Sequence, residues 1–226
     1  MTVAVPKETA EHEKRVSLTP DTVKKLIEKG LSVSIEKDAG LASNYLDSAY
    51  EDAGATIIDD RAGLFSGADI LLSIQTPPQE DLDRLKKGTV LVCFLWALQN
   101  RDTVDFLREK GITALGMDAI PRISRAQNMD ALSSMSSIAG YKAALIGAGE
   151  LDRYLPMMMT AAGTIAPAKV LVLGAGVAGL QAIATAKRLG AVVEAFDIRP
   201  VVKEQVESLG AKFVEVPLEE DTETKG

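Results

Sequence analysis

Three glycines and an aspartate have the spacing with the clearest chemical meaning in this sequence. Gly174, Gly176 and Gly179 follow the pattern G-x-G-x-x-G, and Asp197 lies 18 residues beyond the third glycine. Glycines at these positions allow a tight turn, close approach of a pyrophosphate and close packing of a helix on a strand. A carboxylate at about this distance accepts hydrogen bonds from the hydroxyl groups of an adenosine ribose. The spacing therefore predicts a dinucleotide-binding loop.

The residues around this motif have the patterns of the elements that such a loop needs. Residues 170–173 are a continuous apolar run, typical of a strand in a parallel sheet. Residues 177–189 have helical spacing and end at Gly190, and residues 191–196 are a second apolar run. The helix N-terminus offers N–H groups to phosphates. Because the Asp197 carboxylate would repel a 2′-phosphate, the sequence favours NAD(H) over NADP(H), an inference tempered by the neighbouring Arg199.

The composition is that of a soluble globular chain with one large or two modest domains. It has 226 residues, 46% hydrophobic and 25% charged, with a formal net charge of −7. Basic residues are scattered and aromatic residues make up 4%, which argues against a nucleic-acid surface. No uninterrupted apolar run reaches the length of about 18 residues that spans a bilayer, so we expect no direct membrane insertion. Cys93, the only cysteine, is expected to be a buried, inert thiol, and no residue is assigned to a metal.

Apolar segments alternate with segments of helical spacing along the chain, which predicts the α/β class with largely parallel sheets. We expect two Rossmann-like domains, residues 1–130 and 131–226, joined by a long helix at about 126–154. After Asp197 the sequence predicts one helix (200–209) and one strand (211–216). Since a complete dinucleotide fold has about six strands, we expect the second domain to be truncated after its first half.

A polar stretch at residues 121–137 is the second informative feature. Ser124 and Gln127 are spaced as a capping box, which predicts a helix beginning at Arg125. Gln127, Asp130, Ser134 and Ser137 would then share one helix face. Two interpretations stay open: a solvated, capped surface, or the polar wall of a cleft that offers donors to a ribose, a phosphate or a carboxamide.

Several segments together resemble one family. They are P-K-E at 6–8, R-V-S-L-T-P at 15–20, P-R-I-S-R-A-Q-N-M-D at 121–130, P-M-M-M-T-A-A-G-T at 156–164 and G-A-G-V-A-G-L-Q-A-I-A-T-A-K-R-L-G-A at 174–191. The chain is similar over essentially its whole length to the NAD(H)-binding component, domain I of the alpha subunit, of proton-translocating nicotinamide nucleotide transhydrogenase. The N-terminal pattern is shared with the related alanine dehydrogenases.

The resemblance implies a function and a set of residues. It implies hydride transfer from NADH to NADP⁺, which is bound on a separate partner domain, while a membrane-spanning component couples the transfer to proton movement. It also implies a homodimer, peripheral to the membrane on its cytoplasmic or matrix-equivalent face. The residues that it places at the nicotinamide end of NAD(H) are Arg122, Ile123, Ser124, Gln127, Asp130 and Ser133. Those at the pyrophosphate are Ala175, Gly176 and Val177, and those at the adenosine ribose are Asp197, Ile198 and Arg199.

On this interpretation we expect Gln127 and Asp130 to be the catalytic residues, which orient the nicotinamide ring. The resemblance also implies a mobile loop over the nucleotide at a position beyond residue 226. Because the sequence ends before that position, we expect the nucleotide site to be incomplete.

Two alternatives remain open. An alanine dehydrogenase-like enzyme needs groups that move protons, and in that family these are a lysine and a histidine. The resemblance places Gln75 and Trp96 at those positions, and neither is an acid or base at neutral pH. Arg15 matches a carboxylate-binding position of that family and is expected only to brace the domain, and His12 is expected to be solvated. The other alternative is a non-catalytic NAD-binding fragment. Met157, Met158 and Met159 are expected to pack in the core.

Overall fold

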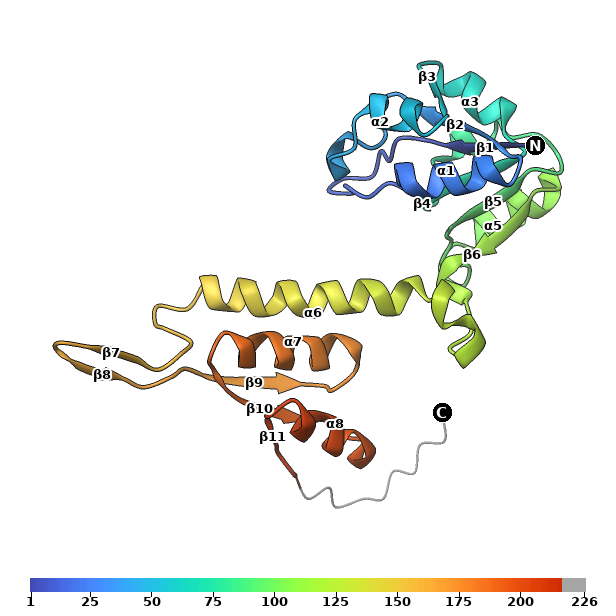
Figure 1. The fold of residues 1–226 in the computed structure, drawn as a ribbon. Coiled ribbons are helices and arrows are strands. Elements are labelled where there is room, and N and C mark those ends of the chain that lie inside the picture. Colours follow the sequence, from blue (N-terminus) through green and yellow to red (C-terminus); the bar gives the residue numbers. More distant parts are fainter. Residues whose placement is uncertain (217–226) are drawn as a thin grey trace. The chain divides into compact units, whose positions relative to one another are not determined.

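The first six strands form a single parallel sheet (Figure 1). The computed structural model describes residues 1–216. The strands of this sheet are β1 (Thr2–Val5), β2 (Ser32–Glu36), β3 (Thr56–Ile58), β4 (Ile70–Gln75), β5 (Val90–Phe94) and β6 (Thr113–Gly116). Their order is β3-β2-β1-β4-β5-β6, and every pairing is parallel. This is the strand order of a complete doubly wound sheet, and the predicted α/β class is confirmed.

Short helices connect these strands. They are α1 (Pro20–Glu28), α2 (Asp47–Asp52), α3 (Arg61–Gly67), α4 (Gln79–Leu82) and α5 (Arg101–Lys110), with the 3₁₀ turn η1 (Leu41–Ser43). Two further 3₁₀ turns, η2 (Met117–Ala119) and η3 (Ser124–Met129), follow β6. Thr19 caps α1 through a reciprocal pair of bonds with Thr22, and Pro20 opens the helix, and both residue types are favoured at these positions.

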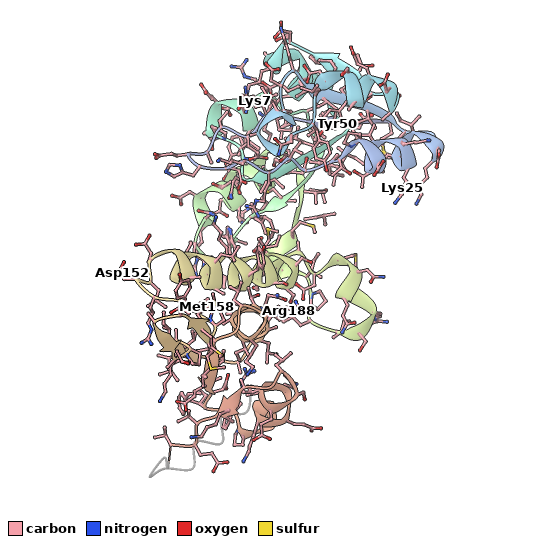
Figure 2. The ribbon with its side chains drawn as sticks, turned by 60° about the vertical axis from the view of Figure 1, so that its left-hand side comes forward. Lys7, Lys25, Tyr50, Asp152, Met158 and Arg188 are labelled. Carbon is pink, nitrogen blue, oxygen red and sulfur yellow. The ribbon has the colours of Figure 1, made fainter. Side chains whose placement is uncertain are left out.

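The core of this first unit lies between the sheet and its helices. Tyr50, labelled in Figure 2, is fully buried, and its hydroxyl donates a hydrogen bond to the Leu18 carbonyl at 2.9 Å. Leu71 and Leu91 of the central strands are also fully buried. Cys93 is buried beside them, and this burial raises the pKa of its thiol to about 11. The prediction of a buried thiol is confirmed, and its inertness stays a prediction.

The contacts divide the chain into two units, Met1–Asp130 and a second that begins at Ala131. The second unit contains α6 (Ala131–Gly149), β7 (Met158–Thr160), β8 (Gly163–Ile165), β9 (Lys169–Leu173), α7 (Val177–Arg188), β10 (Val192–Phe196), η4 (Pro200–Val202), α8 (Lys203–Ser208) and β11 (Lys212–Phe213). Three of its strands form a parallel sheet in the order β11-β10-β9. This corresponds to the 3-2-1 half of a dinucleotide fold.

The long helix is shorter than predicted. It spans Ala131–Gly149 rather than about 126–154, and residues 124–129 form the 3₁₀ turn η3. Ile123 is the N-cap residue of this turn, and no side chain forms a capping hydrogen bond there. The predicted capping box of Ser124 and Gln127 is therefore wrong. Because Gln127 lies outside α6, it does not share a helical face with Ser134 and Ser137.

The methionine segment also differs from the prediction. Met158 and Met159 lie on a two-stranded antiparallel hairpin formed by β7 and β8. All six residues of its strands are exposed, and Met159 is 76% exposed. Figure 1 shows the hairpin extending from the end of α6, and Figure 2 labels Met158 on it. The three methionines are therefore surface residues, and the expectation that they pack in the core is wrong.

Candidate dinucleotide-binding site

The glycine motif occupies the turn between β9 and α7. Gly174 has a φ of +95°, in the left-handed region where a side chain is strained. Its backbone N–H donates to the carbonyl of Phe196 at 2.7 Å, which ties the start of the turn to the end of β10. The chain can therefore leave β9 sharply at this residue.

The other two glycines differ in what surrounds them. A Cβ atom built on Gly179 would lie 1.8 Å from the carbonyl oxygen of Gly174, so α7 can pack on the turn only without a side chain there. A Cβ atom on Gly176 would meet nothing within 4 Å. The third glycine is thus needed for packing, while the second leaves open space beside the backbone. This is the division of roles that a pyrophosphate-binding turn requires.

The N-terminus of α7 has the character of an anion site. Gly176 is its N-cap residue and provides no side-chain cap, and the first turn contains no acidic residue. Lys187 and Arg188 lie in the last turn, where they complement the helix dipole. The initial N–H groups of α7 are therefore not satisfied by a capping side chain, and a phosphate is the ligand that such a helix end favours.

Asp197 follows β10 and lies against the glycine turn. Its Oδ2 accepts a hydrogen bond from the backbone N–H of Ala175 at 2.7 Å. Its Oδ1 accepts the backbone N–H of Arg199 at 2.8 Å, and the guanidinium of Arg199 contacts both oxygens at 3.0 Å. The Asp197 side chain is only 6% exposed. The hydrogen bonds from the Arg199 side chain have the largest effect on the pKa of Asp197 and lower it. Burial opposes this effect, and the backbone donors lower the pKa further, so it lies far below its usual range.

This arrangement has a consequence for ribose binding. A carboxylate offers about four lone-pair positions, and the four donors named above fill them. The Arg199 side chain is 55% exposed, so it can exchange its two bonds for solvent at small cost. A ribose that binds Asp197 must therefore displace the Arg199 guanidinium while the bond from Ala175 remains.

A close helix contact beside the turn was not predicted. A Cβ atom on Gly140 of α6 would lie 2.0 Å from the carbonyl oxygen of Ala178, in the first turn of α7. Ser137 Oγ lies 3.5 Å from Gln181 Oε1 across the same contact. The small residues of α6 thus allow α6 to lie directly against α7 (Figure 1). A glycine inside a helix is the signal that points to such an approach.

The residues expected at the nicotinamide end lie on the segment around η3. Arg122 and Ile123 precede it, Ser124 and Gln127 belong to it, Asp130 follows it and Ser133 lies in the first turn of α6. Arg122, Ser124 and Gln127 are exposed, and Ile123 is 43% exposed. Asp130 and Ser133 are half-buried. The five residues up to Asp130 belong to the first unit, and Ser133 belongs to the second.

The first unit has the doubly wound order but a different turn after β1. There the chain reads Pro6-Lys7-Glu8, and the Glu8 carboxylate accepts the backbone N–H groups of Ile74 at 2.6 Å and Gln75 at 3.2 Å. Burial raises the pKa of Glu8 against the opposing effect of these two donors. The Glu8 carboxylate therefore ties the turn after β1 to the end of β4.

The residues that bear on amino-acid oxidation form a separate cluster. Glu13 accepts hydrogen bonds from the Arg15 guanidinium, at 2.8 and 2.6 Å, and from the Gln75 amide at 2.8 Å. Arg15 also lies over the Phe94 ring, and the ring of Trp96 stacks with that of Phe94. The cluster braces the first unit through bonds within the protein, which supports the expected bracing role of Arg15.

His12 lies outside this cluster. Its side chain is 90% exposed, next to Glu11, which confirms the expected solvated position.

Two family models match the chain in succession. The N-terminal domain model of alanine dehydrogenase/PNT matches residues 4–139, and the corresponding C-terminal domain model matches residues 143–225. The chain belongs to the alanine dehydrogenase/PNT family. The second model contains the glycine turn, Asp197 and Arg199, so the candidate site lies in the family's C-terminal domain.

Relatives in this family differ in their sequence identity to the chain. An NAD(P) transhydrogenase subunit alpha polypeptide of Rhodospirillum rubrum is 53% identical over 96% of this chain and 58% of its own length. NAD(P) transhydrogenase subunit alpha of Haemophilus influenzae is 47% identical over 98% of this chain and 43% of its own length. Alanine dehydrogenase of Bacillus subtilis is 34% identical over 88% of this chain and 52% of its own length. The chain thus resembles these transhydrogenase subunits more than that dehydrogenase, and spans about half the length of each.

The two solved structures described next also differ in their similarity to the chain, with the transhydrogenase more similar than the alanine dehydrogenase. A transhydrogenase from Sinorhizobium meliloti superposes with a TM-score of 0.92 and 46% identity, over 95% of this chain and 64% of that one. An L-alanine dehydrogenase superposes with a TM-score of 0.84 and 29% identity, over 94% of this chain and 60% of that one.

In residues 1–216 no helix combines the length and the apolar character needed to cross a membrane.

Proposed function

We propose that this chain is the NAD(H)-binding component of a proton-translocating transhydrogenase. Bound NADH supplies a hydride to NADP⁺ on a partner domain, and a membrane-spanning partner couples this transfer to proton movement. The observation that carries the proposal is the turn at Gly174–Gly179 with Asp197 against it. It combines an uncapped helix N-terminus, open space at Gly176 and a buried carboxylate.

The residues of the second unit account for binding and for the choice of nucleotide. The backbone of Ala175, Gly176 and Val177 would hold the pyrophosphate, since the Gly176 position has room for it. Asp197, with Ile198 and Arg199 beside it, would hold the adenosine ribose. Because the pKa of Asp197 lies below its usual range, the carboxylate is charged at neutral pH and disfavours a 2′-phosphate.

Positioning is the main chemical task left to the remaining residues. A hydride that passes between two nicotinamides needs no side chain to accept a proton, and the rings must approach to roughly 3–3.5 Å. Gln127 and Asp130 orient the ring through its carboxamide or ribose, and Ser124 and Ser133 add donors. Arg122 binds a phosphate or a ribose, and Ile123 limits the access of water to the ring.

The structure offers little support for amino-acid oxidation. Gln75 and Trp96 stand where an alanine dehydrogenase is expected to have a lysine and a histidine, and the guanidinium of Arg15 is bonded to Glu13. A substrate carboxylate would have to displace this buried internal carboxylate. A hydride donor without proton-transfer groups fits transhydrogenation better.

The proposal includes an assembly. The partners are the NADP(H)-binding and membrane-spanning components and a second copy of this chain, and the complex places this component at the cytoplasmic or matrix-equivalent face of the membrane. The test is to mix the purified chain with an NADP(H)-binding component and follow NADPH formation from NADH and NADP⁺. Turnover that requires both proteins is the expected result. NADH binding without any turnover in the mixture would refute the transhydrogenase role and leave only a nucleotide-binding protein.

A further inference from the structure

Trp96 combines an unusual backbone conformation with an exposed ring. It follows the carboxyl end of β5, and its φ is +48°, in the left-handed region that bulky side chains rarely adopt. Trp96 is 43% exposed, whereas Phe94 and Leu95 just before it are 8% and 6% exposed. A strained residue of this kind persists only where the surrounding structure fixes it, and such residues cluster at ligand sites.

Hydrogen bonds fix the backbone on both sides of Trp96. Its carbonyl accepts the backbone N–H groups of Gln99 at 2.9 Å and Asn100 at 3.0 Å. The Asn100 side chain donates to the Leu95 carbonyl at 2.8 Å, and the Leu95 N–H donates to Asp118 Oδ1 at 2.7 Å. The left-handed turn at Trp96 is therefore set before any ligand binds.

The Trp96 ring is the exposed member of a stack within the first unit. Its centroid lies 6.3 Å from that of Phe94, with 19° between the two planes. The Arg15 guanidinium lies 5.6 Å from the Phe94 centroid. Phe94 is buried, so the stack becomes accessible at Trp96. An exposed indole can stack with a further flat group, and it binds a cation better than other aromatic side chains do.

The residues proposed for the nicotinamide end lack such a ring surface. The stretch 121–130 offers Arg122, Gln127 and Asp130 but contains no aromatic residue. It follows β6, which pairs in parallel with β5 (Figure 1), so it and Trp96 come from the same edge of the first sheet. Trp96 therefore adds a π surface to an edge that otherwise supplies polar groups.

We propose that the Trp96 indole stacks on the nicotinamide ring of NAD⁺, a planar N-alkylpyridinium cation. The inference rests on the proposed function and adds a residue to it. The oxidised ring is aromatic and carries a positive charge, whereas the reduced ring is neutral and no longer aromatic. Because indole attracts cations through its ring face, this contact favours NAD⁺ over NADH.

The first test uses the whole chain and the fluorescence of Trp96, the only tryptophan. The probe is 1-methylnicotinamide, which has the cationic ring without the nucleotide, and neutral nicotinamide is its matched control. We expect saturable quenching with an unchanged fluorescence lifetime, and affinity for nicotinamide lower by about threefold or more. ADP-ribose, which lacks the ring, should bind without this quenching.

Variants test the contact by a readout that needs no tryptophan. Line broadening of the 1-methylnicotinamide proton resonances should disappear with Trp96→Leu and persist with Trp96→Phe. In calorimetric titrations, Trp96→Leu should weaken NAD⁺ binding by about threefold to tenfold and NADH binding by less than about twofold. Leu98→Ala, at an 80% exposed position in the same loop, is the control and should change neither. Circular dichroism establishes that each variant folds.

Quenching that rises linearly with 1-methylnicotinamide and shortens the lifetime would overturn the inference, because it is collisional. Line broadening that Trp96→Leu leaves intact, or equal weakening of NAD⁺ and NADH, would also overturn it. None of these results touches NADH binding at the turn between β9 and α7. Binding of 1-methylnicotinamide by a chain that binds neither NAD⁺ nor NADH would instead refute the proposed function.

Discussion

Asp197 and Ala175 are joined by a hydrogen bond of 2.7 Å from the backbone N–H of Ala175 to Oδ2 of Asp197. This bond links the end of β10 to the glycine turn that follows β9, so the regions proposed to bind ribose and pyrophosphate are positioned together. Asp197 therefore has a structural role in the turn as well as its proposed role at the ribose.

Gly176→Ala and Gly179→Ala form a matched pair. The new methyl group at 176 meets nothing within 4 Å, so we expect unchanged stability but NADH binding weakened at least tenfold, because the methyl enters the space of the pyrophosphate. The methyl group at 179 meets the Gly174 carbonyl at 1.8 Å and should lower the free energy of unfolding by about 1–3 kcal/mol. Urea unfolding and nucleotide titration distinguish them. Equal loss of stability in both variants would contradict the assigned roles.

Arg199→Ala tests whether the Arg199 guanidinium and a bound ribose compete for the Asp197 carboxylate. Removal of the guanidinium frees one lone-pair position on each carboxylate oxygen and removes a cation next to a 2′-phosphate. The ratio of NADH to NADPH affinity should rise by about threefold to tenfold, as expected for one charge-assisted contact. Competitive titration of both nucleotides measures this ratio. Arg188→Ala, in the last turn of α7, is the control and should leave it unchanged; a ratio that falls in Arg199→Ala would show that Arg199 helps to bind NADH.

The Glu13–Arg15 pair predicts acid sensitivity of the first unit. The Arg15 side chain, opposed by burial and assisted by Gln75, lowers the pKa of Glu13 to about 2. An unfolded glutamate has a pKa of about 4.3. Because the folded pKa is the lower one, the stabilisation is present above pH ~4.3 and is lost as the pH falls toward 2.

Glu13→Gln should therefore lower the free energy of unfolding at pH 7 by about 1–2 kcal/mol and flatten its decline below pH ~4.3. Urea unfolding followed by the fluorescence of Trp96, the only tryptophan, measures both effects. Glu11→Gln, whose parent side chain is 87% exposed, is the control. A variant that declines in acid as steeply as the parent would exclude this pair as the cause.

Cys93 provides a probe of unfolding in the first unit. Cys93 is 1% exposed, and burial raises the pKa of its thiol to about 11, so at pH 8 the thiol is protonated. Reaction with a disulfide reagent should be at least a hundredfold slower than in the urea-unfolded chain, since only the thiolate reacts. Reaction of the native chain at the unfolded rate would show that β5 opens readily.

The sequence predicted the elements with strong local signals. The β9 run, the turn at Gly174, the helix after it and the carboxylate at 197 all follow from patterns within a short stretch, and the strands of the first sheet follow from apolar runs. Helix starts were less predictable: Ser124 and Gln127 have capping-box spacing, but residues 124–129 form a 3₁₀ turn.

Long-range contacts were the main feature that the sequence could not show. The bond between Ala175 and Asp197 depends on how two strands align, and the occupation of that carboxylate by Arg199 depends on a side-chain rotamer. The methionines of residues 157–159 look apolar in sequence, yet the hairpin has no described layer against it. The proposed roles of Gln127 and Asp130 rest on the family resemblance and stay predictions.

The most direct test of the central claim is a titration of the purified chain with NADH and, separately, with NADPH, followed by nucleotide fluorescence. The account predicts saturable NADH binding and NADPH binding at least tenfold weaker, because the charged Asp197 carboxylate accepts ribose hydroxyls and repels a 2′-phosphate. Binding of NADPH as tight as that of NADH, or no binding of either nucleotide, would contradict the assignment of an NAD(H) site to the turn between β9 and α7.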